Sequence, residues 1–378
     1  SYVPIQGPPG TGKTYTGAQL VHTLVNAGQR EGITAMSHAA IVNLMQAVVD
    51  PFKEEGDSGK LRAVRKAKEG ALRGIRYVDD NAGVARSGFN VVAGTTWLFA
   101  SKPMREVPVD VLVVDEAGQL GLADTLASTI SATNVILLGD PQQLPQVSQA
   151  SHPGGAGASA LEHLLDGDIT VPADRGVLLE TTWRMHPDVC EFISDVMYGG
   201  RLHSHPCCGG QSVAGATGLR WLRAEHKGRS TESPEEAAIV VAKVRELLGR
   251  PWTDQHGVTR PLTVRDFMVV APYNDQRRCI TEALQVDPAT RRVEVGTVDK
   301  FQGREAAVVL FSMATSSAEY MPRSADFLFS KNRLNVAISR ARCLAYLVCT
   351  DELLDTRARN VEEMTLISAL CSFVERAA

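Results

Sequence analysis

The sequence of 378 residues lacks an apolar run near the roughly 20 residues that a membrane-spanning helix needs. No basic stretch followed by an apolar one is visible, so nothing in it predicts a secretory signal. Cysteine is scarce: its seven residues are an odd number without regular spacing, which argues against a disulfide framework. We therefore expect no membrane partner, and a reducing, intracellular compartment such as the cytoplasm.

What is present is the composition of a globular protein, with 44% apolar and 22% charged residues. The length favours two domains of ordinary size. The net charge of -4 does not exclude a nucleic-acid partner, because local basic patches decide that question.

Short apolar runs rich in β-branched residues alternate with helical stretches along the whole chain. Typical runs are GITAMS (32–37), VDVLVVDEA (109–117), NVILLGD (134–140), DFMVVAPYN (266–274) and EAAVVLFSMA (305–314). Strands buried on both faces look like this, which predicts parallel sheets with crossover helices. We predict an α/β fold of two doubly wound domains, 1–175 and 176–378.

Residues 51–80 interrupt this rhythm, because they are charged and poor in large apolar side chains. Their helical propensity predicts a short helical insertion in the first domain. The basic residues are either a phosphate-binding patch or a solvated helix face. They are Lys60, Arg62, Arg65, Lys66, Lys68, Arg73 and Arg76.

The segment GPPGTGKT fits the P-loop pattern G-x-x-x-x-G-K-[ST] and lies between an expected strand and an expected helix. Its members are Gly7, Pro8, Pro9, Gly10, Thr11, Gly12, Lys13 and Thr14. Glycines allow the loop amides and the helix dipole to face phosphates. We expect Lys13 to bind the β- and γ-phosphates of ATP, and the Thr14 hydroxyl to ligate Mg²⁺.

A second motif places two carboxylates at the end of an apolar strand. Asp115 suits Mg²⁺ coordination, and Glu116 suits the base that activates the attacking water. A third strand is followed by GDPQQLPQ, in which Gln143 is of the right type to hydrogen-bond a γ-phosphate or its water.

In this order the three motifs resemble those of the superfamily 1 helicases. Further matches are TTWRMHP (181–187), VAPYNDQ (270–276), VGTVDKFQGRE (295–305) and NVAISRAR (335–342). The details are most similar to the branch containing the helicase of nonsense-mediated RNA decay and the Okazaki-fragment nuclease-helicase. They are also similar to bacterial helicases fused to a RecB-like nuclease. The resemblance implies two tandem RecA-like domains with Mg·ATP between them.

The resemblance also implies roles for residues far along the chain. Arg184 and Arg340 match the arginines that reach the γ-phosphate, and Trp183 matches the aromatic residue that stacks on adenine. Residues near the ribose and phosphates match Gln302, Gly303 and Glu305. Single-stranded nucleic acid is expected at Ser37, His38, Thr95, Thr96, Pro272, Asn274 and Thr297. Trp97 can stack a base or be buried.

Two other patterns carry weaker expectations. The segment RLHSHPCCGG (201–210) holds two histidines and two cysteines, but no second ligand pair accompanies them, so we expect an ordinary loop. No nuclease motif is present. The family also has an adenine-reading glutamine upstream of the P-loop, so we expect a further region, or a nuclease module, outside this segment.

The sequence therefore predicts a monomeric, ATP-dependent helicase or translocase on single-stranded DNA or RNA, moving 5′ to 3′ by resemblance. Two alternatives stay open: an ATP-switched translocase or clamp that separates no strands, and a non-enzymatic nucleic-acid-binding module. A P-loop kinase is a more distant option.

Overall fold

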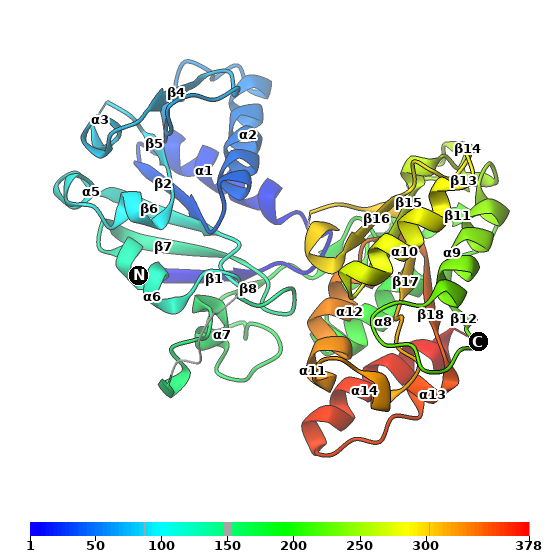
Figure 1. The fold of residues 1–378 in the computed structure, drawn as a ribbon. Helices are drawn as coiled ribbons and strands as arrows, with labels where there is room; N and C mark the ends of the chain where they lie inside the picture. The colour runs from blue at the N-terminus through cyan, green and yellow to red at the C-terminus, as the bar shows by residue number, and fades with distance from the viewer. Residues whose placement is uncertain (87, 147–152, 302, 378) are drawn as a thin grey trace. The chain divides into compact units, whose positions relative to one another are not determined.

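The computed structural model describes residues 1–86, 88–146, 153–301 and 303–377 (Figure 1). The chain divides into two compact units, Ser1–Leu179 and Glu180–Ala378. We expected the boundary at 175/176. In the structure it follows Leu179, because β8 (Val177–Leu178) pairs with β1 (Tyr2–Gln6) and so belongs to the first unit.

The first unit is built on one eight-stranded sheet in which every pair of neighbouring strands is parallel. Its order is β4-β3-β5-β2-β6-β7-β1-β8. The strands not yet bounded are β2 (Glu31–Ala35), β3 (Ala63–Lys66), β4 (Ile75–Val78), β5 (Val91–Ala93), β6 (Val109–Asp115) and β7 (Ala132–Gly139). Parallel strands bring all their carboxyl ends to one edge, where the predicted ATP-binding residues follow β1, β6 and β7.

Helices cover both faces of this sheet. One face packs on α1 (Lys13–Asn26) and α2 (His38–Glu54), which bury a core that includes Val21, Leu44 and Phe52. The other face packs on the shorter helices α3 (Asn81–Ala85), α4 (Thr96–Phe99), α5 (Lys102–Glu106), α6 (Leu122–Thr129) and α7 (Ala160–Leu165). The helix α7 begins with a full capping box, in which Ser159 and Glu162 exchange hydrogen bonds.

The prediction of a helical insertion at 51–80 is wrong. Residues up to Glu54 complete α2, and the rest supplies β3 and β4, which extend the sheet at one edge. Val64 and Ile75 are buried under the helices, and β3 pairs with β5 over Ala63–Arg65. The gain from sheet pairing and burial outweighs the weak helical propensity of this segment.

The second unit has a five-stranded parallel sheet in the order β12-β18-β17-β15-β16. Its strands are β12 (Gly218–Arg223), β15 (Phe267–Ala271), β16 (Glu294–Thr297), β17 (Ala306–Ser312) and β18 (Ala341–Cys349). The helices α9 (Pro234–Leu247) and α10 (Asn274–Gln285) pack on one face. Three further helices pack against one another and against the strands β12, β17 and β18. They are α8 (Pro187–Tyr198), α12 (Lys331–Ile338) and α14 (Val361–Arg376).

Small elements complete the second unit. They are the parallel pair β9 (Thr181–Thr182) and β10 (His203–Ser204), the antiparallel strands β11 (Ser212–Val213), β13 (Pro251–Thr253) and β14 (Thr259–Pro261), and the short helices α11 (Ala325–Leu328) and α13 (Asp351–Leu354). Two parallel α/β units in tandem confirm the predicted fold class. Among the described residues, no helix is both long enough and apolar enough to cross a membrane.

Glu31, the first residue of β2, is a buried carboxyl group without a hydrogen-bond partner for either side-chain oxygen. Burial, together with the nearby Asp110 carboxylate, raises the pKa of Glu31 to about 8. In the unfolded chain the group ionises near its ordinary pKa of 4.5. Folding therefore takes up a proton between these two values, and stability is lost as the pH rises from about 4.5 to about 8.

We expect Glu31→Gln to remove this pH dependence, because a neutral amide has no ionised form to bury. At pH 8 the variant should be more stable than the wild type by up to an order of 4 kcal/mol, and the gain should vanish near pH 4. Urea unfolding at both pH values measures it. The matched control is Glu106→Gln, at an exposed residue of α5. An unchanged pH slope in Glu31→Gln would contradict the prediction.

Candidate active site and nucleic-acid interface

The loop between β1 and α1 has the geometry of a phosphate-binding loop. Gly10 and Gly12 have φ angles of 77° and 81°, which side chains with a Cβ rarely adopt. A Cβ on Gly7 would lie 2.1 Å from Cγ of Lys13, so only glycine fits there. The Lys13 ammonium folds over the loop and donates to the Gly7 carbonyl at 2.6 Å. The loop is thus closed around the start of α1, as phosphate binding requires.

Asp115 and Glu116 lie at the end of β6, next but one to β1 in the sheet. Burial and the neighbouring Glu116 carboxylate raise the pKa of Asp115 to about 7, against the opposing effects of the Glu116 amide and the Lys13 ammonium. Asp115 Oδ1 accepts a hydrogen bond from that amide at 2.9 Å. Glu116 has a φ of 52°, an unusual backbone angle for a residue with a side chain. Lys13 and both carboxylates therefore meet at one edge.

The strand β7, which lies between β6 and β1 in the sheet, is followed by a third set of polar residues. Asp140 follows β7 and is 2% exposed, and its carboxylate accepts from the Gln143 side-chain amide at 2.9 Å. Gln6, at the end of β1, donates to the same carboxylate and also bonds to the backbone of Ile169 and Val171. Gln143 is thereby held at the carboxyl edge on which the P-loop lies.

Two predicted residues of the second unit, Arg184 and Glu305, form an ion pair that Arg342 joins. Arg184 Nε donates to Glu305 Oε2 at 2.7 Å, and Arg342 donates to the other oxygen at 2.6 Å. Burial opposes ionisation of Glu305, but the two guanidinium groups outweigh it and hold its pKa below the ordinary value. Arg340 is 3% exposed and donates to the carbonyl of Arg304, next to Glu305. Both predicted γ-phosphate arginines therefore lie on one face of this unit.

Sequence reasoning expected Glu305 near the nucleotide but did not predict its ion pairs with Arg184 and Arg342. It also missed Gln211. Gln211 donates to the carbonyls of Arg184 and Arg342 and so ties their backbones together. No local pattern marks Gln211, since its partners are distant in sequence. Gly303 has a φ of 78°, and Gln302 lies outside the described residues.

Trp183, the predicted adenine platform, is 52% exposed. The ring of His205 stacks on it, with centroids 3.6 Å apart and an interplanar angle of 19°. His205 belongs to the segment 201–210, for which we expected an ordinary loop. Its nitrogen Nδ1 faces the Cys207 sulfur at 3.0 Å. This segment thus supports the Trp183 ring through His205.

The predicted nucleic-acid residues of the first unit follow neighbouring strands, β2 and β5. Ser37 and His38 are exposed, and the Ser37 hydroxyl caps α2 by accepting from the amide of Ala40 at 3.1 Å. Thr95 and Thr96 are half-buried at the start of α4. All four lie at the same carboxyl edge, on adjacent strands.

The corresponding residues of the second unit also share one edge. Ala271 is paired with Thr297 across β15 and β16, so the segment that follows β15 lies beside Thr297. Asn274 is exposed and Thr297 is half-buried. Pro272, in the chain segment that follows β15, is buried.

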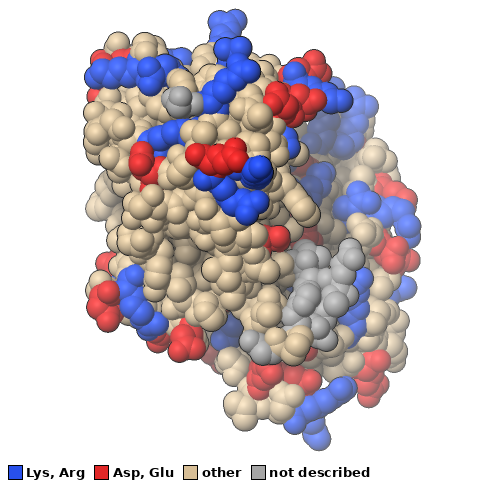
Figure 2. Space-filling view, turned by 90° about the vertical axis from the view of Figure 1, so that its left-hand side faces the viewer, with Lys and Arg blue, Asp and Glu red and all other residues tan. Residues whose placement is uncertain are grey.

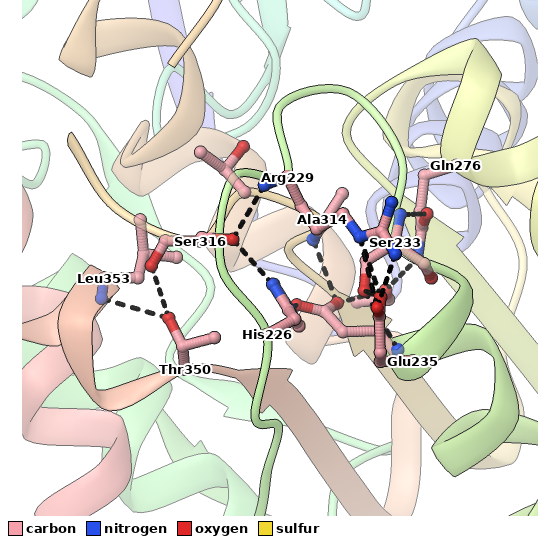
Figure 3. Close-up of polar contacts among 12 residues, drawn as sticks. His226, Arg229, Ser233, Glu235, Gln276, Ala314, Ser316, Thr350 and Leu353 are labelled. Atoms are coloured by element: carbon pink, nitrogen blue, oxygen red, sulfur yellow. Dashed lines mark hydrogen bonds and ion pairs between the residues drawn. The ribbon is translucent and has the colours of Figure 1, made fainter. Parts of the chain in front are cut away.

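A buried polar network fixes the helix that carries Asn274 (Figure 3). Gln276, in the first turn of α10, donates to the Ser312 hydroxyl at 2.8 Å and accepts from the amide of Ser233 at 2.7 Å. The Ser312 hydroxyl donates to Glu236, which also accepts from the amide of Ala314 at 2.9 Å. The starts of α9 and α10 are therefore locked to the carboxyl end of β17.

The same network continues to β18 through a histidine. His226 contacts Glu236 at 3.1 Å through Nε2 and the Ser316 hydroxyl at 2.7 Å through Nδ1 (Figure 3). The Thr350 hydroxyl donates to the Ser316 carbonyl at 2.6 Å. His226, Glu236 and Ser316 are buried, so each polar group depends on these partners. The network fixes the edge of the second unit on which Asn274 and Thr297 lie.

In the described part of the chain, one group of His, Cys and carboxylate side chains is close enough to share a metal ion. It consists of His22, Glu55 and Asp57. Asp57 is paired with Lys60 at 2.7 Å, and His22 is 3.1 Å from the Asn26 amide. The side chains of this group are therefore already engaged in contacts within the protein.

Together, a P-loop, an acidic pair at the next-but-one strand and a second parallel unit that carries Arg184 and Arg340 define a P-loop NTPase with tandem RecA-like units. Family models described as AAA domain match residues 157–352 and residues 1–163. The first match covers more than half of the chain, which therefore belongs to the AAA-domain family. The predicted membership of the superfamily 1 helicases is confirmed.

Curated relatives match across nearly the whole chain. The DNA replication ATP-dependent helicase/nuclease DNA2 of Gallus gallus is 29% identical over 90% of this chain and 34% of its own length. The helicase/nuclease JHS1 of Arabidopsis thaliana is 26% identical over 90% of this chain and 26% of its own. The DNA-binding protein SMUBP-2 of Mesocricetus auratus is 24% identical, over 94% and 42%.

The chain thus spans between about a quarter and two fifths of the length of these relatives. Among solved structures, an arterivirus nonstructural protein 10 helicase in complex with DNA covers 97% of this chain, at 17% identity and a TM-score of 0.49.

Proposed function

We propose that this chain is the motor segment of a nucleic-acid helicase, which hydrolyses ATP and moves along a single strand. The observation that carries the proposal is the meeting of Lys13, Asp115 and Glu116 at one sheet edge, beside a closed P-loop. Family membership supports it, as do two relatives that are named ATP-dependent helicases. A kinase is disfavoured, because the second unit carries Arg184 and Arg340, the arginines of the helicase motifs.

We propose that Thr14 and Asp115 hold Mg²⁺. The residues fit this ion, since carboxylate and hydroxyl oxygens are the ligands that it prefers. Burial favours the protonated form of Asp115, and a cation beside it would favour the ionised form. When bound, the ion would neutralise phosphate charge.

In the hydrolysis that we propose, Glu116 orients the attacking water and accepts its proton, and Gln143 hydrogen-bonds the water or the γ-phosphate. Arg184 and Arg340 bind the γ-phosphate of the same nucleotide as Lys13. A guanidinium group stays charged and binds phosphate through two parallel hydrogen bonds. Each cycle of hydrolysis then changes how the protein holds the strand.

The track is proposed to be single-stranded nucleic acid, held by backbone amides and small polar side chains that contact phosphates regardless of sequence. The exposed residues Ser37, His38, Asn274 and the half-buried Thr95, Thr96 and Thr297 form this set. The proposed direction of movement along the strand, 5′ to 3′, rests on the resemblance to this branch of the family. Affinity for matched DNA and RNA strands at one salt concentration separates the two kinds of track.

The direct test is ATP hydrolysis with and without a single strand. We expect turnover to rise at least about tenfold with the strand, within the range of coupling between two sites. The measurement is phosphate release at saturating ATP and rising oligonucleotide concentration. Hydrolysis that ignores the strand would remove the motor assignment, and absence of both hydrolysis and ATP binding would favour the non-enzymatic alternative.

A translocase or clamp that separates no strands is the second candidate. It is favoured by the first unit, in which residues 51–80 form sheet strands and not a separate wedge. Unwinding of a forked duplex, compared with displacement of streptavidin from a single strand, distinguishes the two candidates.

We further propose a monomer in an intracellular, reducing compartment, joined to further domains as in the longer relatives. The seven cysteines are all free thiols, which supports the compartment. Sedimentation of the isolated chain tests the monomer.

A further inference from the structure

The most basic stretch of the chain is 60–78, with seven Lys and Arg against one Glu, in a chain whose net charge is -4. Lys60 is paired with Asp57. Within the described residues, the other six form no ion pair: Arg62, Arg65, Lys66, Lys68, Arg73 and Arg76. By contrast, second-unit arginines pair with carboxylates, among them Arg201, Arg229, Arg245, Arg260 and Arg278.

The strand pairing places three of these cations at the nucleic-acid edge of the first unit. Arg65 of β3 is in register with Ala93 of β5, so the end of β3 lies beside the chain that leads to Thr95. Lys66 ends β3 and Lys68 follows it. Arg65 Nη2 is 3.4 Å from Nδ1 of His38, one of the predicted nucleic-acid residues. Of the other three, Arg62 and Arg73 precede β3 and β4, at the opposite edge, and Arg76 lies within β4.

The connection after β3 is packed in place. A Cβ on Gly70 would lie 2.1 Å from the ring of Tyr77, so the backbone touches the aromatic side chain directly. The Tyr77 hydroxyl accepts from the amide of Leu72 at 2.9 Å. Lys68 is therefore carried on a connection whose path is set by Tyr77.

An aromatic side chain lies at the same edge. Trp97, in the first turn of α4, is 80% exposed, whereas its neighbours Leu98 and Phe99 are fully buried. The sequence left burial and base stacking open for Trp97, and its exposure excludes burial. An exposed indole close to cations suits a nucleobase, which offers a flat face next to phosphates.

The opposite edge differs in charge pattern. Figure 2 shows the side of the molecule that carries α3 and α5, from which β1 starts, and there Lys and Arg are interspersed with Asp and Glu. Mixed charge on that side gives no field of one sign, whereas Arg65, Lys66 and Lys68 gather at the end of β3 and form no ion pair within the described residues.

We propose that the carboxyl end of β3, together with Trp97, is an additional single-strand binding site, which extends the track beyond the family motifs. Arg65, Lys66 and Lys68 bind backbone phosphates, and Trp97 stacks a base. The proposal rests on the proposed function, because it assigns further residues to the same track. An acidic protein segment would also attract the cations, but the adjacent nucleic-acid residues and the exposed indole favour the single strand.

The test is the affinity of the whole chain for a fluorescent oligothymidylate or oligouridylate, followed by anisotropy over a range of salt. The variant Arg65→Gln/Lys66→Gln/Lys68→Gln should bind about tenfold or more weakly near 0.1 M salt. Its plot of log affinity against log salt should be shallower by about 2, because each phosphate contact on a single strand contributes about 0.7. The control Arg62→Gln/Arg73→Gln/Arg86→Gln removes the same charge from the opposite edge and should bind as the wild type does.

Trp97→Ala should weaken binding by about 5- to 150-fold with an unchanged salt slope, because stacking releases no counterions. Trp97→Phe should keep most of the affinity. The site is overturned if the triple variant at β3 binds like the wild type, or if the control loses as much as it does. A wild type that binds no single strand would instead overturn the proposed function, so the two failures are distinguishable.

Discussion

Glu116→Gln should bind ATP as tightly as the wild type and hydrolyse it about 10²- to 10⁴-fold more slowly. Glutamine has the size of glutamate but cannot accept a proton from water at neutral pH. Lys13 and Asp115 stay in place in the variant, and the loop glycines are untouched. Binding should therefore be kept while the chemical step is lost.

The measurement pairs single-turnover hydrolysis with binding of a fluorescent ATP analogue. A matched control is Asp124→Asn, which removes an exposed carboxylate in the first turn of α6. It should hydrolyse ATP at the wild-type rate. Turnover of Glu116→Gln within a few-fold of the wild type would show that another group accepts the proton.

The second large effect is expected for Arg340→Ala, with a loss of about 10³- to 10⁵-fold in turnover and a smaller change in ATP affinity. Arg340 is 3% exposed and lies beside the carboxylate shared by Arg184 and Arg342. A charge held in place before the reaction stabilises the developing negative charge without reorganisation. Lysine would keep the charge but lose the planar fork, so Arg340→Lys should also be strongly impaired.

Arg304→Ala is the neighbouring control, because its side chain is half-exposed and pairs with Glu294 outside this group. Its turnover should stay close to that of the wild type. Since Arg340 is buried, circular dichroism and single-strand affinity report whether each variant is folded. A folded Arg340→Ala with wild-type turnover would remove Arg340 from the catalytic set.

The phosphate loop and the acidic pair were accessible from sequence, because local chemistry dictates both. Gly7, Gly10 and Gly12 occupy positions where a Cβ collides or the φ angle is positive, so the pattern itself encodes the loop. Buried parallel strands read as continuous apolar runs, which is why β6 and β7 were recognisable with the polar residues that follow them.

Residues 51–80 show where local reasoning fails. Their charge and helical propensity predicted a helix, but Val64 and Ile75 find a sheet edge to extend. Propensity is worth a few tenths of a kcal/mol per residue, whereas burial of an apolar side chain is worth about 1.5–3 kcal/mol. This correction turns a presumed helix face into a row of cations beside the predicted track.

The sequence alone determined the protein class, the predicted ATP-binding residues and the alternation of strands and helices, because each of these depends on contacts within a few residues. Tertiary structure decided the rest. It stacked His205 on Trp183, paired Glu305 with two arginines, bonded Gln276 to Ser312 and placed Arg65 of β3 in register with Ala93 of β5. These partners are remote in sequence, and only strand order and register, which depend on packing of the whole unit, bring them together.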